Sequence, residues 1–362
     1  MKIGFDGKRF FHNTSGLGNY SRDLLRILAG QLPENEYYLF DREPSERGRE
    51  TLALPNVHFS PVPSGLFARQ LQAGREACAA GCDIFHGLSG ELPLRWENPK
   101  IRKVVTIHDL IFRIYPQYYS FFDREIHFRK FRNAALQADA VVAISEQTRT
   151  DIVRYLEIPE DKIHVIYQGC SPLFKKQYTE EEKKQVKDKY GLPEKFLLNV
   201  GTIEERKNGL SVAEAVRGTG IPLVFIGRET AYADAIRKTA DHRQVRFLKN
   251  VSNEELAVIY RLATVFIYPS VYEGFGIPII EALFSGTPVI TNKDGVFPEA
   301  GGSSAVYVDI RDTAGMQAEI LRLWNDPDLR KRLAEAGTRF VQKFSDEVLA
   351  EEWKQLYRGL LM

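Results

Sequence analysis

Residues 266–290 read FIYPSVYEGFGIPIIEALFSGTPVI, an apolar run, a glycine-containing loop and a second apolar segment in immediate succession. The run before Pro269 predicts a buried strand, and Pro278 predicts the first turn of a helix. The glycines on both sides of Phe275 let backbone amides approach a ligand closely, and the helix N-terminus that follows favours an anion. The segment therefore predicts a βα unit with an anion-binding loop at the carboxyl end of its strand.

The same alternation of short β-branched runs and longer amphipathic segments extends along the chain and is typical of a parallel sheet. The predicted strands lie at 3–6, 37–40, 104–108 and 140–144, and then at 196–201, 223–226, 245–248, 265–268, 289–291 and 306–308. A polar stretch at 170–195 interrupts the pattern, so we place a linker near 171–178. The prediction is an α/β protein with two Rossmann-like, doubly wound parallel-sheet domains, 1–172 and 173–345, facing each other across a cleft.

The composition argues against several classes of protein. The chain has 362 residues, and 49 Lys and Arg offset 48 Asp and Glu, so no strong field favours nucleic acid. Charged residues interrupt the N-terminal apolar run, which argues against a signal peptide, and no apolar stretch is long enough to span a bilayer. The three cysteines, Cys78, Cys82 and Cys170, predict free thiols in a reducing compartment. We expect a cytoplasmic protein.

Two glutamates in the 266–290 segment are candidates for contacts with sugar hydroxyls. Glu273 lies on the loop and Glu281 just over a turn into the helix, so both can face the space above the strand ends. Carboxylates accept hydrogen bonds well from vicinal diols, so one could hold a sugar and the other a ribose. A solvated helix face is the alternative for each glutamate. The glycine loop and the adjacent apolar run IPII favour the ligand.

A second group of candidates lies in NVGTIEERKNGL, residues 199–210. Gly201 ends a predicted strand, and Arg206 and Lys207 precede a helix predicted from about Asn208. Adjacent cations at the carboxyl edge of a sheet can neutralise a diphosphate, with Arg offering a planar fork and Lys a point charge. A solvated charge run on a turn is the alternative.

The first half carries a histidine at a strand end. The segment IRKVVTIHDL, residues 101–110, places His108 where open α/β sheets bind ligands, so it could donate a hydrogen bond to a sugar hydroxyl or to developing charge. A structural histidine is the alternative. Gly16, Leu17 and Gly18 form a G-x-G turn ahead of a helix, but Ser21 stands where a dinucleotide fingerprint requires glycine, so NAD is not supported.

Other cofactor motifs are missing from the sequence. It contains neither a G-x-x-x-x-G-K-[ST] loop nor H-E-x-x-H. Asp326-Pro327-Asp328 is interpreted as a helix start with proline in the first turn and not as a metal-ligand pair. We therefore expect no metal and no other cofactor.

Together these segments resemble the retaining glycosyltransferases of family four, the glycosyl transferases group 1, which have the GT-B fold. The resemblance covers nearly the whole chain and is carried by GLGNYSRDLL, TIHDLIF, AISEQTRTDI, VIYQG, NVGTIEERKNGL, FLKNVSNEELAVIYRLATVFIYPSVYEGFGIPIIEAL and PEAGG. It implies that the last segment, 346–362, is a helix that returns to the N-terminal domain.

The resemblance also implies roles for individual residues. Glu281 would hold the donor ribose, and Glu273 with the amides of Gly274, Phe275 and Gly276 would meet the sugar and diphosphate. Arg206 and Lys207 match the diphosphate clamp next to Gly201, although Thr202 stands where many members carry an additional arginine. His108 would contact the transferred sugar, and the candidate catalytic residues are therefore His108, Glu273, Lys207 and Arg206. Gly16, Leu17 and Gly18 would form a loop on the acceptor and phosphate side.

The implied reaction is retaining transfer of a sugar from a nucleoside-diphosphate sugar to an acceptor held by the N-terminal domain. The phrase GTIEERKN is similar to that of mannosyl- and rhamnosyltransferases of surface-polysaccharide synthesis, which favours GDP-mannose over UDP-glucose or UDP-N-acetylglucosamine. The acceptor would be a glycan or a lipid-linked glycan. A nucleotide-sugar epimerase of the same fold and a catalytically silent nucleotide-sugar binder remain alternatives.

One segment raises the question of membrane contact. Residues 121–136, FFDREIHFRKFRNAAL, interleave aromatic and basic residues: Phe121, Phe122, Ile126, Phe128 and Phe131 with Arg124, Arg129, Lys130 and Arg132. Such a helix could contact the inner face of a membrane that carries a lipid-linked acceptor. Packing of its apolar face on the N-terminal sheet is the alternative.

Overall fold

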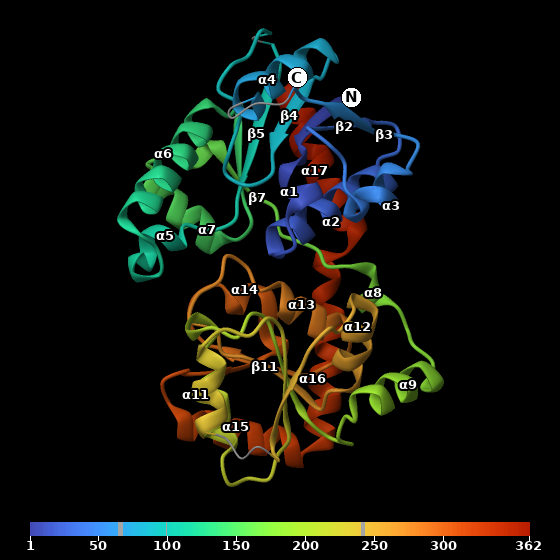
Figure 1. Cartoon of the computed structure of the whole chain (residues 1–362), viewed down its shortest axis with the longest axis vertical. Helices are drawn as coiled ribbons and strands as arrows, with labels where there is room; N and C mark the ends of the chain where they lie inside the picture. The colour runs from blue at the N-terminus through green and yellow to red at the C-terminus, as the bar shows by residue number, and fades with distance from the viewer. Residues whose placement is uncertain (64–67, 99, 240–242) are drawn as a thin grey trace. The chain divides into compact units, whose positions relative to one another are not determined.

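The computed structural model describes residues 1–63, 68–98, 100–239 and 243–362, which form two compact units (Figure 1). Unit 1 comprises Met1–Gly169 and Phe344–Met362, and unit 2 comprises Cys170–Lys343. The divisions lie slightly before the predicted domain boundaries at 172 and 345. Each unit contains one sheet and its own helices.

The sheet of unit 1 has seven parallel strands in the order β3-β2-β1-β4-β5-β6-β7. Its strands are β1 (Lys2–Asp6), β2 (Glu36–Asp41), β3 (Val57–Pro61), β4 (Ile84–Gly87), β5 (Arg102–Ile107), β6 (Ala140–Ala143) and β7 (Ile163–Val165). Its helices are α1 (Gly7–His12), α2 (Gly16–Gln31), α3 (Arg49–Leu52), α4 (Ala68–Ala79), α5 (Ile111–Ile114), α6 (Phe121–Gln137), α7 (Glu146–Asp151) and α17 (Asp346–Leu361).

The sheet of unit 2 has six parallel strands in the order β10-β9-β8-β11-β12-β13. Its strands are β8 (Leu197–Val200), β9 (Leu223–Ile226), β10 (Val245–Leu248), β11 (Val265–Tyr268), β12 (Val289–Asn292) and β13 (Val306–Val308). Its helices are α8 (Pro172–Lys175), α9 (Glu180–Tyr190), α10 (Gly209–Val216), α11 (Tyr232–Thr239), α12 (Asn253–Leu262), α13 (Ile277–Phe284), α14 (Phe297–Gly301), α15 (Thr313–Asn325) and α16 (Pro327–Phe340).

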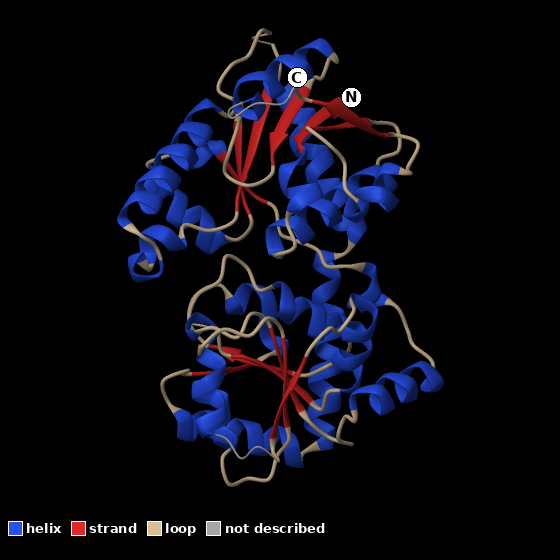
Figure 2. Ribbon diagram, in the orientation of Figure 1, coloured by secondary structure: helices blue, strands red, loops and turns tan. Residues whose placement is uncertain are grey.

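Helices flank the strands of each sheet, as Figure 2 shows. The central strands are accordingly apolar on both faces, and every residue of β9, β11 and β12 is buried. Parallel strands covered on both sides show this continuous apolar pattern because neither face meets water. Both sheets also run outward in two directions from a central pair of strands. The predicted fold class, two Rossmann-like doubly wound sheets, is confirmed.

The last helix, α17, packs in unit 1 against α2. Trp353 and Tyr357 of α17 are fully buried in the same apolar core as the first strands. At its start, the carboxylate of Asp346 accepts a hydrogen bond from the guanidinium of Arg26 on α2 (2.6 Å). The segment after unit 2 therefore returns to the N-terminal unit, as the fold prediction stated.

The prediction that Gly16, Leu17 and Gly18 form a turn ahead of a helix is wrong, because these residues are the first turn of α2. The Asn13 side chain accepts hydrogen bonds from the amides of Ser15 (2.8 Å) and Gly18 (3.1 Å), which starts the helix earlier than expected. A Cβ on Gly18 would lie 2.1 Å from the Asn13 carbonyl oxygen, so this close approach requires glycine.

Three smaller predictions can be compared with the structure. Asp326 caps α16, which starts at Pro327, so the Asp-Pro-Asp sequence is a helix start as predicted. The three cysteines are free thiols as predicted, Cys78 half-buried and Cys82 and Cys170 buried. Within the described ranges, no helix has the length and the apolar character needed to cross a bilayer.

Candidate functional site

The side chain of Glu273 lies where two neighbouring strands of unit 2 end. Strands β8 and β11 pair in the sheet, so the loops that follow them share its carboxyl edge. Arg206 and Lys207 belong to a short turn, Glu205–Lys207, after β8, and Glu273 lies in the loop after β11. The amide of Val271 donates a hydrogen bond to the Arg206 carbonyl (2.9 Å) and ties the loop to the turn. The structure thus brings these three predicted residues together.

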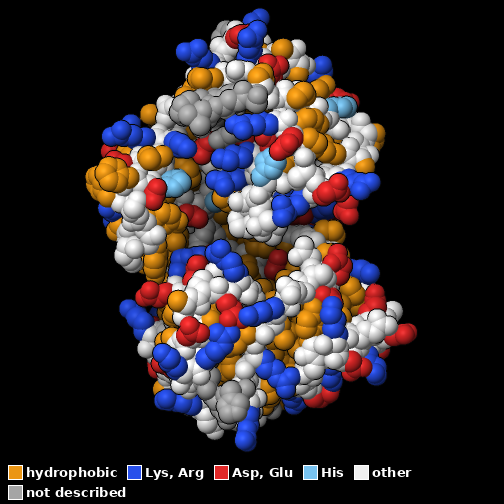
Figure 3. Space-filling view, in the orientation of Figure 1, with side chains coloured by type: hydrophobic (Ala, Val, Ile, Leu, Met, Phe, Trp, Pro, Cys, Tyr) orange, Lys and Arg blue, Asp and Glu red, His pale blue; other side chains and the backbone are white. Residues whose placement is uncertain are grey.

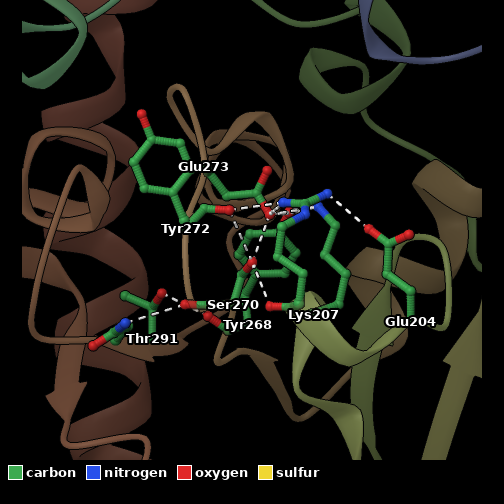
Figure 4. A network of polar contacts seen from close by, with 9 residues as sticks. Glu204, Lys207, Tyr268, Ser270, Tyr272, Glu273 and Thr291 are labelled. Carbon is green, nitrogen blue, oxygen red and sulfur yellow. Dashed lines mark hydrogen bonds and ion pairs between the residues drawn. The ribbon is translucent and has the colours of Figure 1, made fainter. Parts of the chain in front are cut away.

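One carboxylate oxygen of Glu273 is the centre of the cluster. Its Oε1 accepts hydrogen bonds from Nζ of Lys207 (2.5 Å) and Nη1 of Arg206 (2.8 Å). It also accepts from the hydroxyls of Ser270 (2.6 Å) and Tyr268 (3.0 Å). Figure 4 shows the labelled side chains of Lys207, Tyr268 and Ser270 gathered around Glu273. Four donors therefore meet one oxygen.

The charges of the cluster depend on one another. Burial alone would raise the pKa of Glu273, but the charges of Lys207 and Arg206 outweigh burial and lower that pKa to about 2. Burial lowers the pKa of Lys207, and the charge of Glu273 opposes this shift. Only 15% of the Glu273 side chain is exposed, so the cations replace water as its partners. Glu273 is a carboxylate at neutral pH.

Three residues of this cluster were not among the predicted site residues. Glu204 accepts a hydrogen bond from Nη2 of Arg206 (2.8 Å), and the hydroxyl of Tyr268 accepts one from Lys207 (2.6 Å). Ser270 is the third. Tyr268 and Ser270 lie at the end of the strand in the 266–290 segment, so their position at the carboxyl edge was a signal available from the sequence. Nothing in the charge pattern distinguished Glu204 from the neighbouring Glu205.

Glu281 lies on α13, where its Oε2 accepts a hydrogen bond from the hydroxyl of Tyr260 (3.1 Å). Burial is the main reason why the pKa of Tyr268 is raised, and the charges of Glu273 and Glu281 both add to that effect. Because both carboxylates act on the same phenol, they lie in the same part of unit 2. Their hydrogen-bond partners are nonetheless different.

The predicted glycines lie at the same edge of the sheet. Gly201 and Gly276 have φ angles of +137° and +126°, a backbone conformation that residues with a side chain rarely adopt. Gly276 precedes the first residue of α13, and Gly274 and Phe275 are buried just before it. Thr202 follows Gly201 and is half-buried. Backbone amides at the start of α13 therefore lie in the loop that carries Glu273, as an anion site requires.

In unit 1, His108 directly follows β5 at the carboxyl edge of that sheet. Its Nε2 lies 2.9 Å from the carbonyl oxygen of Leu88, and its Nδ1 lies 3.1 Å from the side-chain nitrogen of Gln168. A carbonyl can only accept, so Nε2 carries the hydrogen and Nδ1 accepts from the amide. In this structure the hydrogen that was expected to reach a sugar hydroxyl is donated to Leu88 instead.

Burial lowers the pKa of His108 to about 4; the hydrogen bond to the Leu88 carbonyl opposes this shift, and the charge of Arg9 adds to it. The ring of Tyr20 packs edge-on against His108, with 4.5 Å between the ring centroids. Tyr20 belongs to α2, the helix that begins with the predicted Gly16–Gly18 segment. His108 is therefore a neutral ring held by three neighbours.

A buried polar chain lies behind this histidine. The hydroxyl of Tyr20 is 3.2 Å from Oγ1 of Thr106, which is 2.7 Å from Nε2 of His86. Nδ1 of His86 is 2.8 Å from the hydroxyl of Tyr357 on α17. Burial lowers the pKa of His86 to about 3, so this ring is also neutral. The chain connects α2, two central strands and the C-terminal helix.

A doubly wound parallel sheet in each unit gives the chain the GT-B architecture, with carboxylates and cations gathered at the carboxyl edge of the second sheet. The family model for glycosyl transferases group 1 matches residues 180–340, and that for glycosyltransferase family 4 matches residues 14–172. The chain belongs to the family-four glycosyltransferases, as its sequence motifs indicated.

A relative similar in sequence agrees with this assignment, and two solved structures have a similar fold. The O-antigen chain mannosyltransferase B of Escherichia coli is 28% identical over 387 residues, which cover 99% of this chain and 100% of that protein. Among solved structures, the sucrose-phosphate synthase of Thermosynechococcus elongatus matches with a TM-score of 0.76 and 22% identity, over 100% of this chain and 99% of that one. Anabaena HepE in complex with UDP-glucose matches with a TM-score of 0.76 and 14% identity, over 99% and 100% of the two chains.

Proposed function

We propose that this chain transfers mannose from GDP-mannose to a glycan or lipid-linked glycan acceptor in the synthesis of a surface polysaccharide, with unit 2 binding the donor and unit 1 the acceptor. The observation that carries the proposal is the cluster of Glu273, Arg206 and Lys207 at the carboxyl edge of the unit 2 sheet. Cations suit a diphosphate, and carboxylates suit sugar hydroxyls. The cluster therefore contains groups suited to the diphosphate and groups suited to the sugar.

The choice of mannose rests on the relative that matches the whole chain, an O-antigen chain mannosyltransferase, and on the similarity of GTIEERKN to mannosyltransferases. A thermal-shift comparison of GDP-mannose, UDP-glucose and UDP-N-acetylglucosamine tests it, because a bound ligand stabilises the folded state. GDP-mannose should raise the Tm most, and GDP should raise it more than UDP. A larger Tm shift with either UDP-sugar would contradict GDP-mannose as the donor, but it would not contradict the transfer reaction.

The proposed mechanism retains the anomeric configuration and uses no metal. Arg206, Lys207 and the amides at the start of α13 stabilise the charge of the departing diphosphate, and the departing phosphate takes the proton of the acceptor hydroxyl. NMR of the product tests retention through the configuration of the new glycosidic bond. The rate in EDTA should equal the rate in Mg²⁺, and a loss of activity in EDTA would contradict the metal-independent route.

Release of the nucleoside diphosphate tests the reaction class. Transfer requires release that depends on an added acceptor. An epimerised donor without acceptor would instead support the epimerase alternative, and tight binding without turnover would support a silent binder. Glu281→Gln should lower the kcat/KM by at least tenfold if Glu281 holds the donor ribose. Glu254→Gln, on the exposed surface of α12, is the matched control and should change it less than twofold.

Contact with a membrane belongs to the same proposal, because it would give access to a lipid-linked acceptor. Helix α6 buries only Ala134 and Ala135 completely. Phe121, Phe122 and Ile126 near its start are 63%, 77% and 51% exposed. Hydrophobic side chains gather at the surface over this end of α6 in Figure 3. The exposed aromatic surface suits the acyl–headgroup boundary of a bilayer.

The rest of α6 follows the alternative reading. Phe128 and Phe131 pack against the apolar core of unit 1. Lys130 pairs with Glu91 (3.5 Å) and Arg132 with Glu157 (3.1 Å). Among the described residues, Arg129 has no ion-pair partner, so it is the better site for a charge reversal. The membrane-facing surface is therefore proposed only for the first two turns of the helix.

Flotation with vesicles tests this contact. The protein should float with vesicles that contain anionic lipid and remain behind with neutral ones. The double variant Phe121→Ser, Phe122→Ser and the single variant Arg129→Glu should each reduce the bound fraction severalfold, while Arg75→Glu, at an exposed position of α4, serves as the control. Equal binding of all variants would contradict the contact without affecting the proposed reaction.

A further inference from the structure

Gln168 is a buried amide that reaches His108 from a different strand. It lies just beyond β7, is 4% exposed, and places its side-chain nitrogen 3.1 Å from Nδ1 of His108. Strands β5, β6 and β7 are successive neighbours in the unit 1 sheet, so the residues after β5 and β7 share its carboxyl edge. The contact is therefore a direct product of the sheet topology.

The hydrogen-bond partners fix the protonation of the ring. Nε2 faces the carbonyl oxygen of Leu88, which requires a hydrogen on that nitrogen. The amide nitrogen of Gln168 is a donor, so Nδ1 presents its lone pair. A proton on Nδ1 would point at the amide hydrogens, and the amide would have to rotate to accept it. The pair of contacts thus selects the neutral ring with hydrogen on Nε2.

The charged and titratable groups around the ring support the same state. Arg9 of α1 acts on His108 as a positive charge, and His86 of β4 is a neutral imidazole in the buried chain behind it. The phenol ring of Tyr20 on α2 packs against the imidazole in a T-shaped arrangement. Asp109, the next residue, accepts a hydrogen bond from the amide of Ile111. The group that meets Nδ1 is an amide and not a carboxylate.

We infer that Gln168 is a positioning residue for His108, which fixes the plane of the ring and keeps Nδ1 an acceptor. A role for His108 in transfer rests on the function proposed above, whereas the contact itself does not. In that reaction, His108 therefore serves as a neutral polar group and does not remove the acceptor proton. That proton is left to the departing phosphate.

NMR of protein labelled with ¹⁵N at histidine tests the inference without any substrate. Between pH 8 and pH 5, His108 should show an unprotonated Nδ1 and a protonated Nε2. Gln168→Glu places a carboxylate beside Nδ1, which favours the imidazolium and should raise the midpoint of titration by roughly 1–3 pH units. Gln31→Glu makes the same change at the exposed last residue of α2, about 24 Å along the helix from its start, and should leave His108 unaltered.

Three results would overturn the inference: a hydrogen on Nδ1 in the wild type, an imidazolium in the wild type at neutral pH, or a midpoint in Gln168→Glu equal to that of the wild type. The variant Gln168→Leu distinguishes an effect on the orientation of the His108 ring from an effect on its protonation. It keeps the hydrogen bond to Leu88 but removes the donor to Nδ1, so the resonances of His108 should broaden as the ring gains freedom.

Transfer assays then separate this inference from the proposed function. In Gln168→Glu, kcat should fall as the pH drops through the raised midpoint of His108, by roughly tenfold one pH unit below that midpoint, and recover as the pH rises to 9. A loss of activity independent of pH would indicate a purely structural role and contradict the inference. If no donor supports transfer, the proposed function fails, and the NMR titration still decides the role of Gln168.

Discussion

Glu273 stabilises unit 2 only while it is ionised. Its pKa is about 2 in the folded protein, below the usual value near 4.3, so its contribution is complete above the unfolded pKa and is lost as the pH falls through about 2. The shift corresponds to stabilisation on the order of 3 kcal/mol. Glu273→Gln should therefore lower the free energy of unfolding at pH 7, and the difference from the wild type should shrink between pH 4.5 and pH 2.

Urea unfolding of both proteins across this range measures the effect. Glu205→Gln, at an exposed position of the neighbouring turn, is the control for the loss of one negative charge. A difference between wild type and Glu273→Gln that stays constant with pH would contradict the ion-pair account and would indicate that packing alone explains the loss.

Glu204 competes with a diphosphate for Arg206. It holds Nη2 of that arginine at 2.8 Å, while Nη1 is held by Glu273 and by the Tyr272 carbonyl. Glu204→Gln removes one negative charge beside the clamp, so a nucleoside diphosphate should bind several-fold more tightly. Calorimetric titration with GDP measures the Kd. Glu205→Gln should change the Kd less than Glu204→Gln does, and tighter binding in the Glu205 variant alone would refute the assignment.

Replacing either of two glycines of helix α2 by alanine should have opposite effects on stability. Gly18→Ala would bring a Cβ within 2.1 Å of the Asn13 carbonyl oxygen, so the start of the helix must shift, at a cost of roughly 1–3 kcal/mol. A Cβ at Gly30 meets nothing within 4 Å, and alanine there should stabilise the helix by about 0.5–1 kcal/mol. Thermal unfolding should show a lower Tm for the first variant and a higher one for the second. Equal shifts would contradict the geometry at Asn13.

Most strands were predicted within one or two residues because buried parallel strands are short apolar runs, as in β9 and β11. Three strands, β3, β4 and β7, were not predicted. β3 mixes polar and apolar residues at an edge of the sheet, β7 has only three residues, and β4 includes His86. His86 can lie in the core because its two ring nitrogens form hydrogen bonds with the side chains of Tyr357 and Thr106. Local sequence does not reveal partners that lie so far along the chain.

The candidate site shows the same limit. The sequence predicted Glu273, Arg206 and Lys207 because each follows a predicted strand, and strand ends converge in a parallel sheet. It assigned no role to Gln168, although Gln168 follows a strand in the same way, because the strand β7 itself was not recognised. It also treated His108 as a possible donor to a ligand, whereas the acceptor of its Nε2 hydrogen, Leu88, lies directly after β4, another strand that was not recognised.

At the scale of the whole molecule, the two units should respond differently to acid. Unit 1 buries His86 and His108 as neutral rings, with pKa values of about 3 and 4 against 6.5 in the unfolded chain. The unfolded state therefore binds more protons below pH 6.5, and the stability of unit 1 should fall by up to about 1.4 kcal/mol per pH unit for each histidine. Unit 2 keeps the contribution of Glu273 until the pH is much lower.

Hydrogen exchange measured by mass spectrometry between pH 7 and pH 4.5 tests this order. After correction for the intrinsic effect of pH, peptides from β4 and β5 should lose protection before peptides from β8 and β11. Simultaneous loss of protection in both units, or earlier loss of protection in unit 2, would contradict the expected order.

The return of α17 to unit 1 has a consequence for how the polypeptide matures. Unit 2 is continuous from Cys170 to Lys343, whereas the core of unit 1 is completed by Trp353 and Tyr357. During translation the second unit can acquire its structure as soon as it leaves the ribosome, while the first must wait for its closing helix. The unit whose strands are synthesised first is thus the last to complete its core.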